Sequence, residues 1–323
     1  MPVSARAPEQ PDGLRIEIAG LSVTGPVRSR NEDHLGWIAP GDRAWVPARQ
    51  GDERIPPTEL GGPLVAVVVA DGLGGHADGD LASRFAIATL LDRLAAPEAL
   101  RRVPDALRDA YLEVNARLLV GEAGQGPGGG PRPPGDGRPS APERSRLPAD
   151  GPRRPGAQTT MTALAVTSDT AWVAHVGDCR VYRLRDQILE LVTTDHSQVT
   201  ELLRMHLIRP DQAAAHPGRH LLTRSLGGDV ALRVDVRSGE LRVGDAYLLC
   251  SDGAWSNVSA DEIIAALEGD LDEGTVQLVE RSIARGGDDN ASVIALRVLR
   301  TGEPASPDST GGRRGLLRRV LGA

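Results

Sequence analysis

Acidic residues in this chain recur at the ends of short apolar runs, beside glycine or serine. Asp71 directly follows VAVVVA, Asp178 follows AHVG, and Asp252 follows LLCS. A fourth aspartate, Asp289, stands in GGDDN just before the apolar run ASVIALRVL. Buried strands are rigid anchors, and functional side chains are often carried where such a scaffold ends. The pattern therefore predicts several carboxylates gathered at one edge of the fold.

Such a gathering has a chemical consequence. With the acidic pair Glu32 and Asp33 in RSRNED added, the carboxylates would repel one another, and some would take up protons. A divalent cation removes this repulsion, and Mg²⁺ and Mn²⁺ prefer carboxylate, carbonyl and water oxygens. Two such ions together can activate a water and hold a phosphate in line. One Asp-Gly pair alone is most often a turn, so the prediction rests on the joint pattern.

The apolar runs that would position these carboxylates alternate between strand and helix periodicity. Residues 64–70 are continuous and rich in valine, which indicates a fully buried strand. Residues 80–94 follow with apolar side chains at helical spacing. Further helices are expected at 104–120, 197–207, 260–267 and 275–284, and further strands at 245–250 and 291–299.

Four strand-length runs lie between the predicted helices in the middle of the chain. They cover residues 160–167, 171–176, 180–184 and 188–192, and tight turns join them, which predicts an antiparallel meander. Mixed blocks of strands and helices favour an α+β fold with helices packed outside antiparallel sheets.

Three segments have the composition of unstructured chain. Residues 1–13 are polar, residues 121–157 are dense in Gly, Pro and Arg, and residues 300–323 form a basic tail. Segments with so few large apolar residues cannot bury enough surface to offset their ordering entropy. We therefore expect one domain over 14–299, with a disordered insertion at 121–157 and flexible ends.

Composition excludes several classes of protein. The 323 residues carry a net charge of −7 with both signs interspersed, so nucleic-acid binding is not expected. No apolar stretch reaches the ~18 residues that a membrane span requires, and the polar N-terminus does not resemble a signal peptide. Two cysteines do not make a disulfide framework, and no Cys/His cluster suggests structural zinc. A soluble cytoplasmic protein is expected.

The flanks of the acidic residues carry a family resemblance. The chain resembles the bacterial metal-dependent protein phosphatases of the PPM, or type 2C, serine/threonine phosphatase family. The resemblance spans roughly residues 15–299, and it is carried by the number, order and spacing of the matching segments. These are TGPVRSRNED (24–33), VVADGLGGHADGDLAS (68–83), QTTMTALAV (158–166), HVGDCRVYRL (175–184), TTDHSQVTELL (193–203), HLLTRSLGG (220–228), YLLCSDGAW (247–255) and GGDDNASVIAL (286–296).

The resemblance implies a cofactor of two Mn²⁺ or Mg²⁺ ions. Asp71 would bridge them, and Gly72 would supply a carbonyl ligand. Asp252 and Asp289 would complete the shell of the first ion. The adjacent acids Glu32 and Asp33 would hold metal-bound waters, with Asp33 the more important of the two.

The resemblance also implies a third ion, a phosphate ligand and a mechanism. Asp178 would help to bind the third metal found in bacterial members, and Arg28 would bind the substrate phosphate. Residues 193–228 would form a flap near the active site. The metal-bridging water would attack the phosphoserine or phosphothreonine ester directly, without a phosphoenzyme.

Five positions depart from the family pattern or invite a second interpretation. Leu73 replaces the usual methionine, and some eukaryotic members place a catalytic histidine there, so the general acid is unassigned. His76 is close in sequence, but a helix-start or supporting role is favoured for it. Asp80 replaces a glutamate and Cys179 a serine, and His196 is interpreted as structural.

The implied fold is a four-layer α/β/β/α sandwich of two antiparallel sheets flanked by helices. The implied function is a protein serine/threonine phosphatase, acting as a monomer on phosphorylated proteins and reversing a bacterial Ser/Thr kinase. The alternative is a catalytically weak relative that serves as a regulatory or binding module. Such a relative should have lost one of Asp71, Asp252 or Asp289, and all three are present with Arg28. An enzyme acting on a small phosphoester is a third possibility.

Overall fold

Strands from both ends of the domain lie side by side in the first of two sheets, sheet I. The computed structural model describes residues 13–39, 42–45, 53–73, 77–122, 156–213, 216–228 and 230–302. Sheet I has the order β10-β9-β12-β13-β1-β4. Its strands are β1 (Arg15–Val23), β4 (Glu53–Gly61), β9 (Arg180–Arg185), β10 (Ile188–Leu191), β12 (Ala246–Cys250) and β13 (Ala291–Arg300). β1 and β13 pair antiparallel along their whole length.

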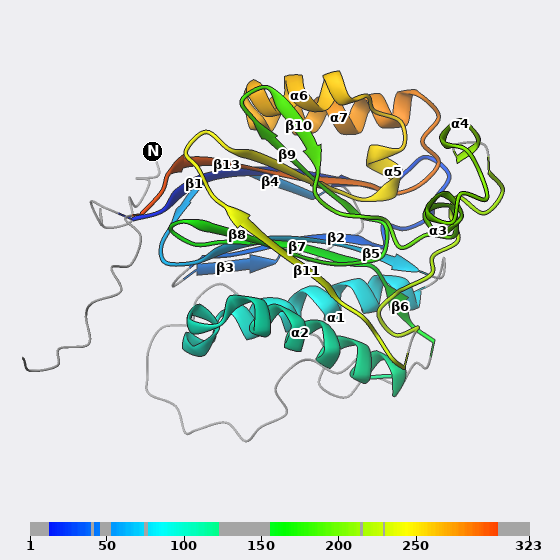
Figure 1. The fold of residues 1–323 in the computed structure, drawn as a ribbon, viewed down its shortest axis with the longest axis horizontal. Coiled ribbons are helices and arrows are strands. Elements are labelled where there is room, and N and C mark those ends of the chain that lie inside the picture. The colour runs from blue at the N-terminus through cyan, green and yellow to red at the C-terminus, as the bar shows by residue number, and fades with distance from the viewer. Residues whose placement is uncertain are drawn as a thin grey trace, which may run out of the picture.

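The second sheet, sheet II, faces the first (Figure 1). Its order is β11-β8-β7-β5-β2-β3, with the short β6 paired to β5. The strands are β2 (Asp33–Ala39), β3 (Asp42–Trp45), β5 (Val65–Leu73), β6 (Gln158–Thr159), β7 (Met161–Val166), β8 (Thr170–Val176) and β11 (Asp235–Glu240).

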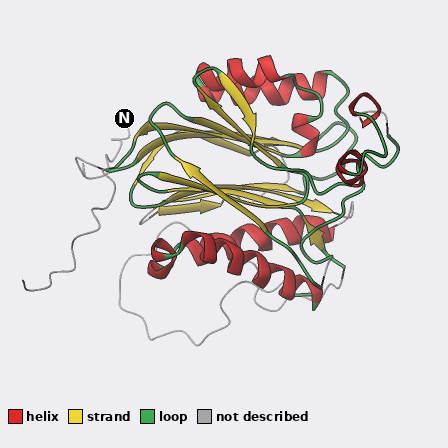
Figure 2. Ribbon diagram, in the orientation of Figure 1, coloured by secondary structure: helices red, strands yellow, loops and turns green. Residues whose placement is uncertain are grey.

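Helices cover the outer face of each sheet (Figure 2). Helices α6 (Ala260–Glu268) and α7 (Leu271–Ala284) pack on sheet I. Helices α1 (Ala77–Leu94) and α2 (Val103–Leu119), joined by the 3₁₀ helix η1 (Pro97–Arg101), pack on sheet II. The short helices α3 (Gln198–Arg204), α4 (Pro210–Ala213) and α5 (Asp252–Trp255) lie near one end of the sandwich. The predicted four-layer α/β/β/α fold is confirmed.

The central strand β5 shows why its sequence is apolar without alternation. Val65, Val67 and Val69 belong to the core between the two sheets. Ala66 and Val68 belong to the core between sheet II and helices α1 and α2. A strand covered on both faces buries every side chain, so a continuous run of valine and alanine is what its position requires.

The predicted four-strand meander is wrong. Strands β7 and β8 pair in sheet II, whereas β9 and β10 pair in sheet I. The chain crosses between the sheets at residues 177–179, where Gly177 has a φ of +113° that favours glycine. Because both pairs of runs are largely apolar, their periodicity does not reveal which sheet each joins.

Other boundaries differ from the prediction in smaller ways. The helix expected at 197–207 covers Gln198–Arg204, and Ser197 caps its start by accepting a hydrogen bond from the Thr200 N–H. Strand β4 was not predicted, since it contains Pro56 and Pro57, and it lies at the edge of its sheet, where proline is tolerated. Most of the predicted disordered segments, and His76, lie outside the described residues. Within the described ranges, no helix is long and apolar enough to cross a membrane.

Candidate metal centre

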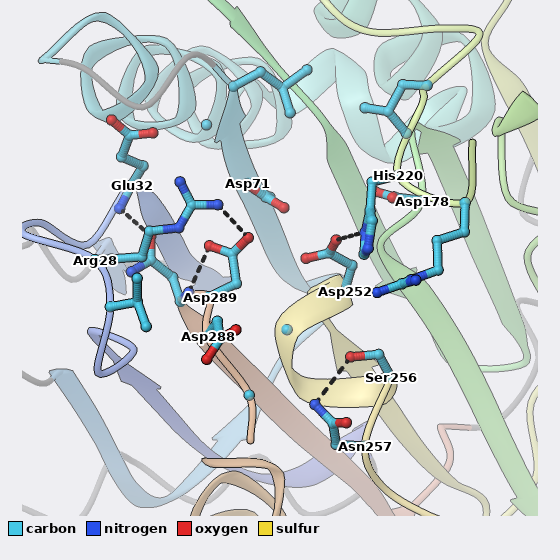
Figure 3. A pocket seen from close by; sticks show the side chains of 18 of the residues that line it. Arg28, Glu32, Asp71, Asp178, His220, Asp252, Ser256, Asn257, Asp288 and Asp289 are labelled. Carbon is cyan, nitrogen blue, oxygen red and sulfur yellow. Dashed lines mark hydrogen bonds and ion pairs between the residues drawn. The ribbon is translucent and has the colours of Figure 1, made fainter. Parts of the chain in front are cut away.

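Most of the predicted carboxylates lie around a cleft where strands of both sheets end. The cleft has a volume of about 830 Å³. Figure 3 shows Arg28 and Glu32 on one side of the opening and Asp178 and His220 on the other. The predicted site residues that line it are Arg28, Glu32, Asp71, Gly72, Asp178, Asp252 and Asp289.

Asp71 stands near the end of β5 and is fixed through its backbone. Its N–H donates to Thr160 Oγ1 at 3.2 Å, and its carbonyl accepts the Thr160 N–H at 2.8 Å. Burial raises the pKa of Asp71 well above its usual range, and the charges of Asp33 and Asp252 raise it further. A cation in the cleft would reverse this shift by stabilising the ionised form.

Gly72 lies where the backbone of three segments converges. A Cβ at this position would lie 2.3 Å from the Gly79 carbonyl oxygen and 2.9 Å from the Glu32 carbonyl oxygen, closer than any side chain tolerates. The Gly72 N–H donates to the Glu32 carbonyl at 3.2 Å. Glycine is therefore required here. The absence of a side chain would also let the backbone approach a ligand closely.

Asp178 lies at the crossing between the sheets, and groups on two sides hold its backbone. The Trp255 indole N–H donates to the Asp178 carbonyl at 3.0 Å. The neighbouring Gly177 N–H donates to His196 Nδ1 at 3.1 Å, and the His196 N–H donates to the Gly177 carbonyl at 2.7 Å. Burial, followed by the charge of Asp252, raises the pKa of Asp178 well above its usual range. His196 therefore has the structural role expected of it.

Arg28 pairs with one of the cleft carboxylates. Its Nη2 donates to Asp289 Oδ2 at 2.6 Å, and this bond raises the pKa of the guanidinium. The loop of Arg28 lies close against the start of β13. A Cβ on Gly25 would lie only 1.9 Å from the Asp289 carbonyl oxygen, so only glycine allows this close approach. Asn290 ties down the same loop by accepting the Glu32 N–H at 2.9 Å.

Asp33 differs from the other predicted site residues, because it is not among the residues that line the cleft. Its side chain is buried, opposite Asp71 in the pairing of β2 with β5. Its Oδ2 accepts hydrogen bonds from the hydroxyls of Ser251 and Ser292, both at 2.7 Å. Burial raises the pKa of Asp33 to about 7, while the two serines oppose that shift and the charges of Asp252 and Asp289 add to it.

Three ionisable residues of the cleft were not singled out from the sequence. They are Arg219, His220 and Asp288. His220 Nδ1 lies 3.9 Å from Asp252 Oδ2, and the ring is well exposed to solvent. The signal was weak: Arg219 and His220 stand in the predicted flap, which has no regular structure at that point, and Asp288 adjoins Asp289. Among the described residues, His220 is the imidazole that lines the cleft.

The donor set fits a hard divalent cation. Every candidate ligand is a carboxylate or carbonyl oxygen, the donor type that Mg²⁺ and Mn²⁺ prefer. Burial and neighbouring carboxylates raise the pKa of Asp71 and of Asp178, and a bound cation would oppose both shifts. The carboxylates are spread around the cleft: within the described part of the chain, no three His, Cys, Asp or Glu side chains converge on one point.

Known proteins share this sequence and fold. The pattern of the protein phosphatase 2C family matches residues 58–285. The serine/threonine protein phosphatase PstP of Mycobacterium tuberculosis is 31% identical over 270 residues, which are 82% of this chain and 45% of that protein. This chain therefore spans under half the length of that relative.

Solved structures agree with the fold. The serine/threonine phosphatase of S. agalactiae superposes with a TM-score of 0.68 at 26% identity, covering 88% of this chain and 99% of that one. The catalytic domain of PstP in complex with two manganese ions superposes with a TM-score of 0.61 at 27% identity, with the same coverage. Since the family pattern covers most of the sequence, the chain belongs to the protein phosphatase 2C family.

Proposed function

We propose that this chain is a metal-dependent protein serine/threonine phosphatase. The observation that carries the proposal is the cleft itself, in which carboxylates from both sheets surround one opening beside an arginine. Phosphate monoesters carry negative charge, so a purely acidic cleft would repel them. Divalent cations reverse the sign of the site, and when bound they supply an activated water and positive charge for the phosphate.

The chain's own residues divide into three roles under this proposal. Asp71, Gly72, Asp252 and Asp289 would hold the two ions, while Glu32 and Asp33 would orient water around them. Asp178 would hold a third ion. Its position across the cleft from Arg28 supports a binding place separate from that of the other two ions.

Arg28 binds the substrate phosphate. Its guanidinium is partly exposed at the cleft and donates to one carboxylate oxygen, and its planar fork can present two N–H groups to phosphate oxygens. When Asp289 holds an ion, the attraction of Asp289 for Arg28 would be weaker. The Arg28 guanidinium would then be free to bind the substrate phosphate. His220 is placed to donate a proton to the departing serine or threonine oxygen, because its ring lines the same cleft.

The class of substrate follows from the relatives, which are named serine/threonine phosphatases. We propose phosphorylated proteins as substrates, a Ser/Thr kinase as the opposing enzyme, and a monomer in the cytoplasm. Residues 14–299 would form the catalytic domain.

Selectivity among phosphoesters tests this class. With Mn²⁺ present, matched peptides bearing phosphothreonine, phosphoserine or phosphotyrosine are compared with a small aryl phosphate by kcat/KM. We expect the threonine and serine peptides to be hydrolysed at least about 10-fold more efficiently than the tyrosine peptide, a difference of about 1.4 kcal/mol in transition-state binding. Preference for the tyrosine peptide or the small ester would contradict the proposed substrate class.

A further inference from the structure

A closed set of buried hydrogen bonds lies behind the cleft, around Asp33. Besides its two contacts with Ser251 and Ser292, the set includes Ser22 and Asn31. Ser22 Oγ and Ser292 Oγ are 2.6 Å apart, and Asn31 Nδ2 donates to Ser22 Oγ at 2.8 Å. Asn31 Oδ1 accepts the Asp33 N–H at 3.1 Å, which closes the ring. All five side chains are at most 5% exposed.

The direction of each bond follows from counting hydrogens. An ionised Asp33 only accepts, and each serine hydroxyl has one hydrogen to give. Ser292 therefore donates to Asp33, so Ser22 must donate to Ser292. Asn31 supplies the bond that Ser22 accepts. The chain of donors runs one way, from Asn31 through Ser22 and Ser292 to Asp33 Oδ2.

Ser251 forms a second, separate arm. Its hydroxyl accepts the Ser292 N–H at 3.0 Å and donates to Asp33 Oδ2. Both arms end on the same carboxylate oxygen of Asp33. Both hydroxyl contacts to this side chain go to Oδ2, and neither goes to Oδ1.

Two of these hydroxyls, those of Ser22 and Ser292, lie in strands between apolar neighbours. Ser22 lies in β1 directly opposite Ser292 in β13, and Ser251 follows β12. Alanine would fill such buried positions without the free-energy cost of desolvating a hydroxyl. A buried hydroxyl therefore needs a hydrogen-bond partner that offsets this cost. The partner here is a buried carboxylate next to the proposed metal ligands.

We propose that Ser22, Ser251, Ser292 and Asn31 are positioning residues that orient Asp33 toward the cations through two donor arms ending on its Oδ2. The inference rests on the proposed metal site, but its test reads metal binding and does not depend on turnover. Groups that orient metal-site residues commonly affect metal affinity about 10- to 100-fold.

Mn²⁺ affinity of the metal-free protein, measured by titration calorimetry, tests the proposal. Ser292→Ala is expected to weaken Mn²⁺ binding about 10-fold, because it removes a direct contact to Asp33. Ser22 does not contact Asp33. Ser22→Ala is nevertheless expected to weaken Mn²⁺ binding about threefold, because Ser292 loses the hydrogen bond that Ser22 donates to it. If Ser292→Ala does not fold, Ser22→Ala carries the test alone, and wild-type affinity in Ser22→Ala would overturn the proposal.

Double-mutant cycles test whether Ser22 and Ser292 act in one arm and Ser251 in the other. Ser22→Ala added to Ser292→Ala should cause no further loss of affinity, since the first arm is already cut. Ser251→Ala added to Ser292→Ala should multiply the losses. Additive effects of Ser22 and Ser292 would overturn the one-way chain of donors.

Thr275→Val is the matched control, because it removes a buried hydroxyl in α7 that donates to the Asp272 carbonyl. It should lower thermal stability without changing Mn²⁺ affinity. A loss of affinity equal to that of Ser292→Ala would show that any buried hydroxyl has this effect, and would overturn the proposal. A wild-type protein that binds Mn²⁺ but releases no phosphate would count against the proposed function and leave the positioning role standing.

Discussion

Replacing Asp71 with asparagine is expected to stop phosphate release while making the metal-free protein more stable at pH 8. The loss of turnover at fixed Mn²⁺ should be on the order of 10³-fold or more, because one of the proposed metal ligands is removed. The gain in stability has a different origin, which is the cost of ionising Asp71 in a buried position beside other carboxylates.

The sign of the stability change follows from the raised pKa of Asp71. Burial, and then the charges of Asp33 and Asp252, raise that pKa above its unfolded value of about 4. Such a group contributes stability at pH values below the unfolded pKa, and the contribution is lost as pH rises through the folded pKa. Asparagine has no charge to lose, so the variant should gain most at pH 8 and little at pH 4.

Thermal unfolding with and without Mn²⁺ measures both effects. The wild type should be stabilised strongly by Mn²⁺ and the Asp71→Asn variant only weakly. Asp169→Asn, at an exposed turn between β7 and β8, is the control and should behave as the wild type in every condition. A variant that is less stable than the wild type without metal at pH 8 would show that Asp71 has a structural role instead.

Replacing Arg28 with alanine is expected to lower kcat/KM for a phosphothreonine peptide about 10²-fold, the usual effect of removing one donor aimed at developing charge. Lysine should restore only part of the loss, because it keeps the charge but not the planar fork. Mn²⁺ affinity should be unchanged or tighter, since Asp289 would be freed from its 2.6 Å ion pair.

Separate measurements of kcat/KM and Mn²⁺ affinity distinguish phosphate binding from support of the metal site. Arg30→Ala is a suitable control, because Arg30 is exposed in the same loop but is not among the residues lining the cleft. Weaker Mn²⁺ binding by Arg28→Ala, with an unchanged KM, would contradict the phosphate-binding role.

The sequence was most informative where burial leaves few alternatives. The continuous run at β5 predicts a strand covered on both faces, and the amphipathic spacing of α1 predicts the helix that covers one of them. The positions of Asp71, Asp178, Asp252 and Asp289 around one cleft were also predicted, because each follows or precedes an apolar strand.

Pairing between distant segments was beyond what periodicity can show. The crossing at Gly177 moves β9 into the other sheet, and only contacts between strands far apart in sequence reveal this. The position of Asp33 behind the cleft depends on Ser22, Ser251 and Ser292, which come from three separate strands or their ends. A serine in an apolar run carries no local sign of such a partner.

The most direct test of the proposed activity is phosphate release from a phosphothreonine peptide by the wild type and by Asp252→Asn, each with Mn²⁺ and with a chelator. We predict rapid release by the wild type with Mn²⁺, none above background with chelator, and none from folded Asp252→Asn in either condition. Release that persists in the chelator or in Asp252→Asn would contradict a metal-dependent phosphatase centred on this cleft.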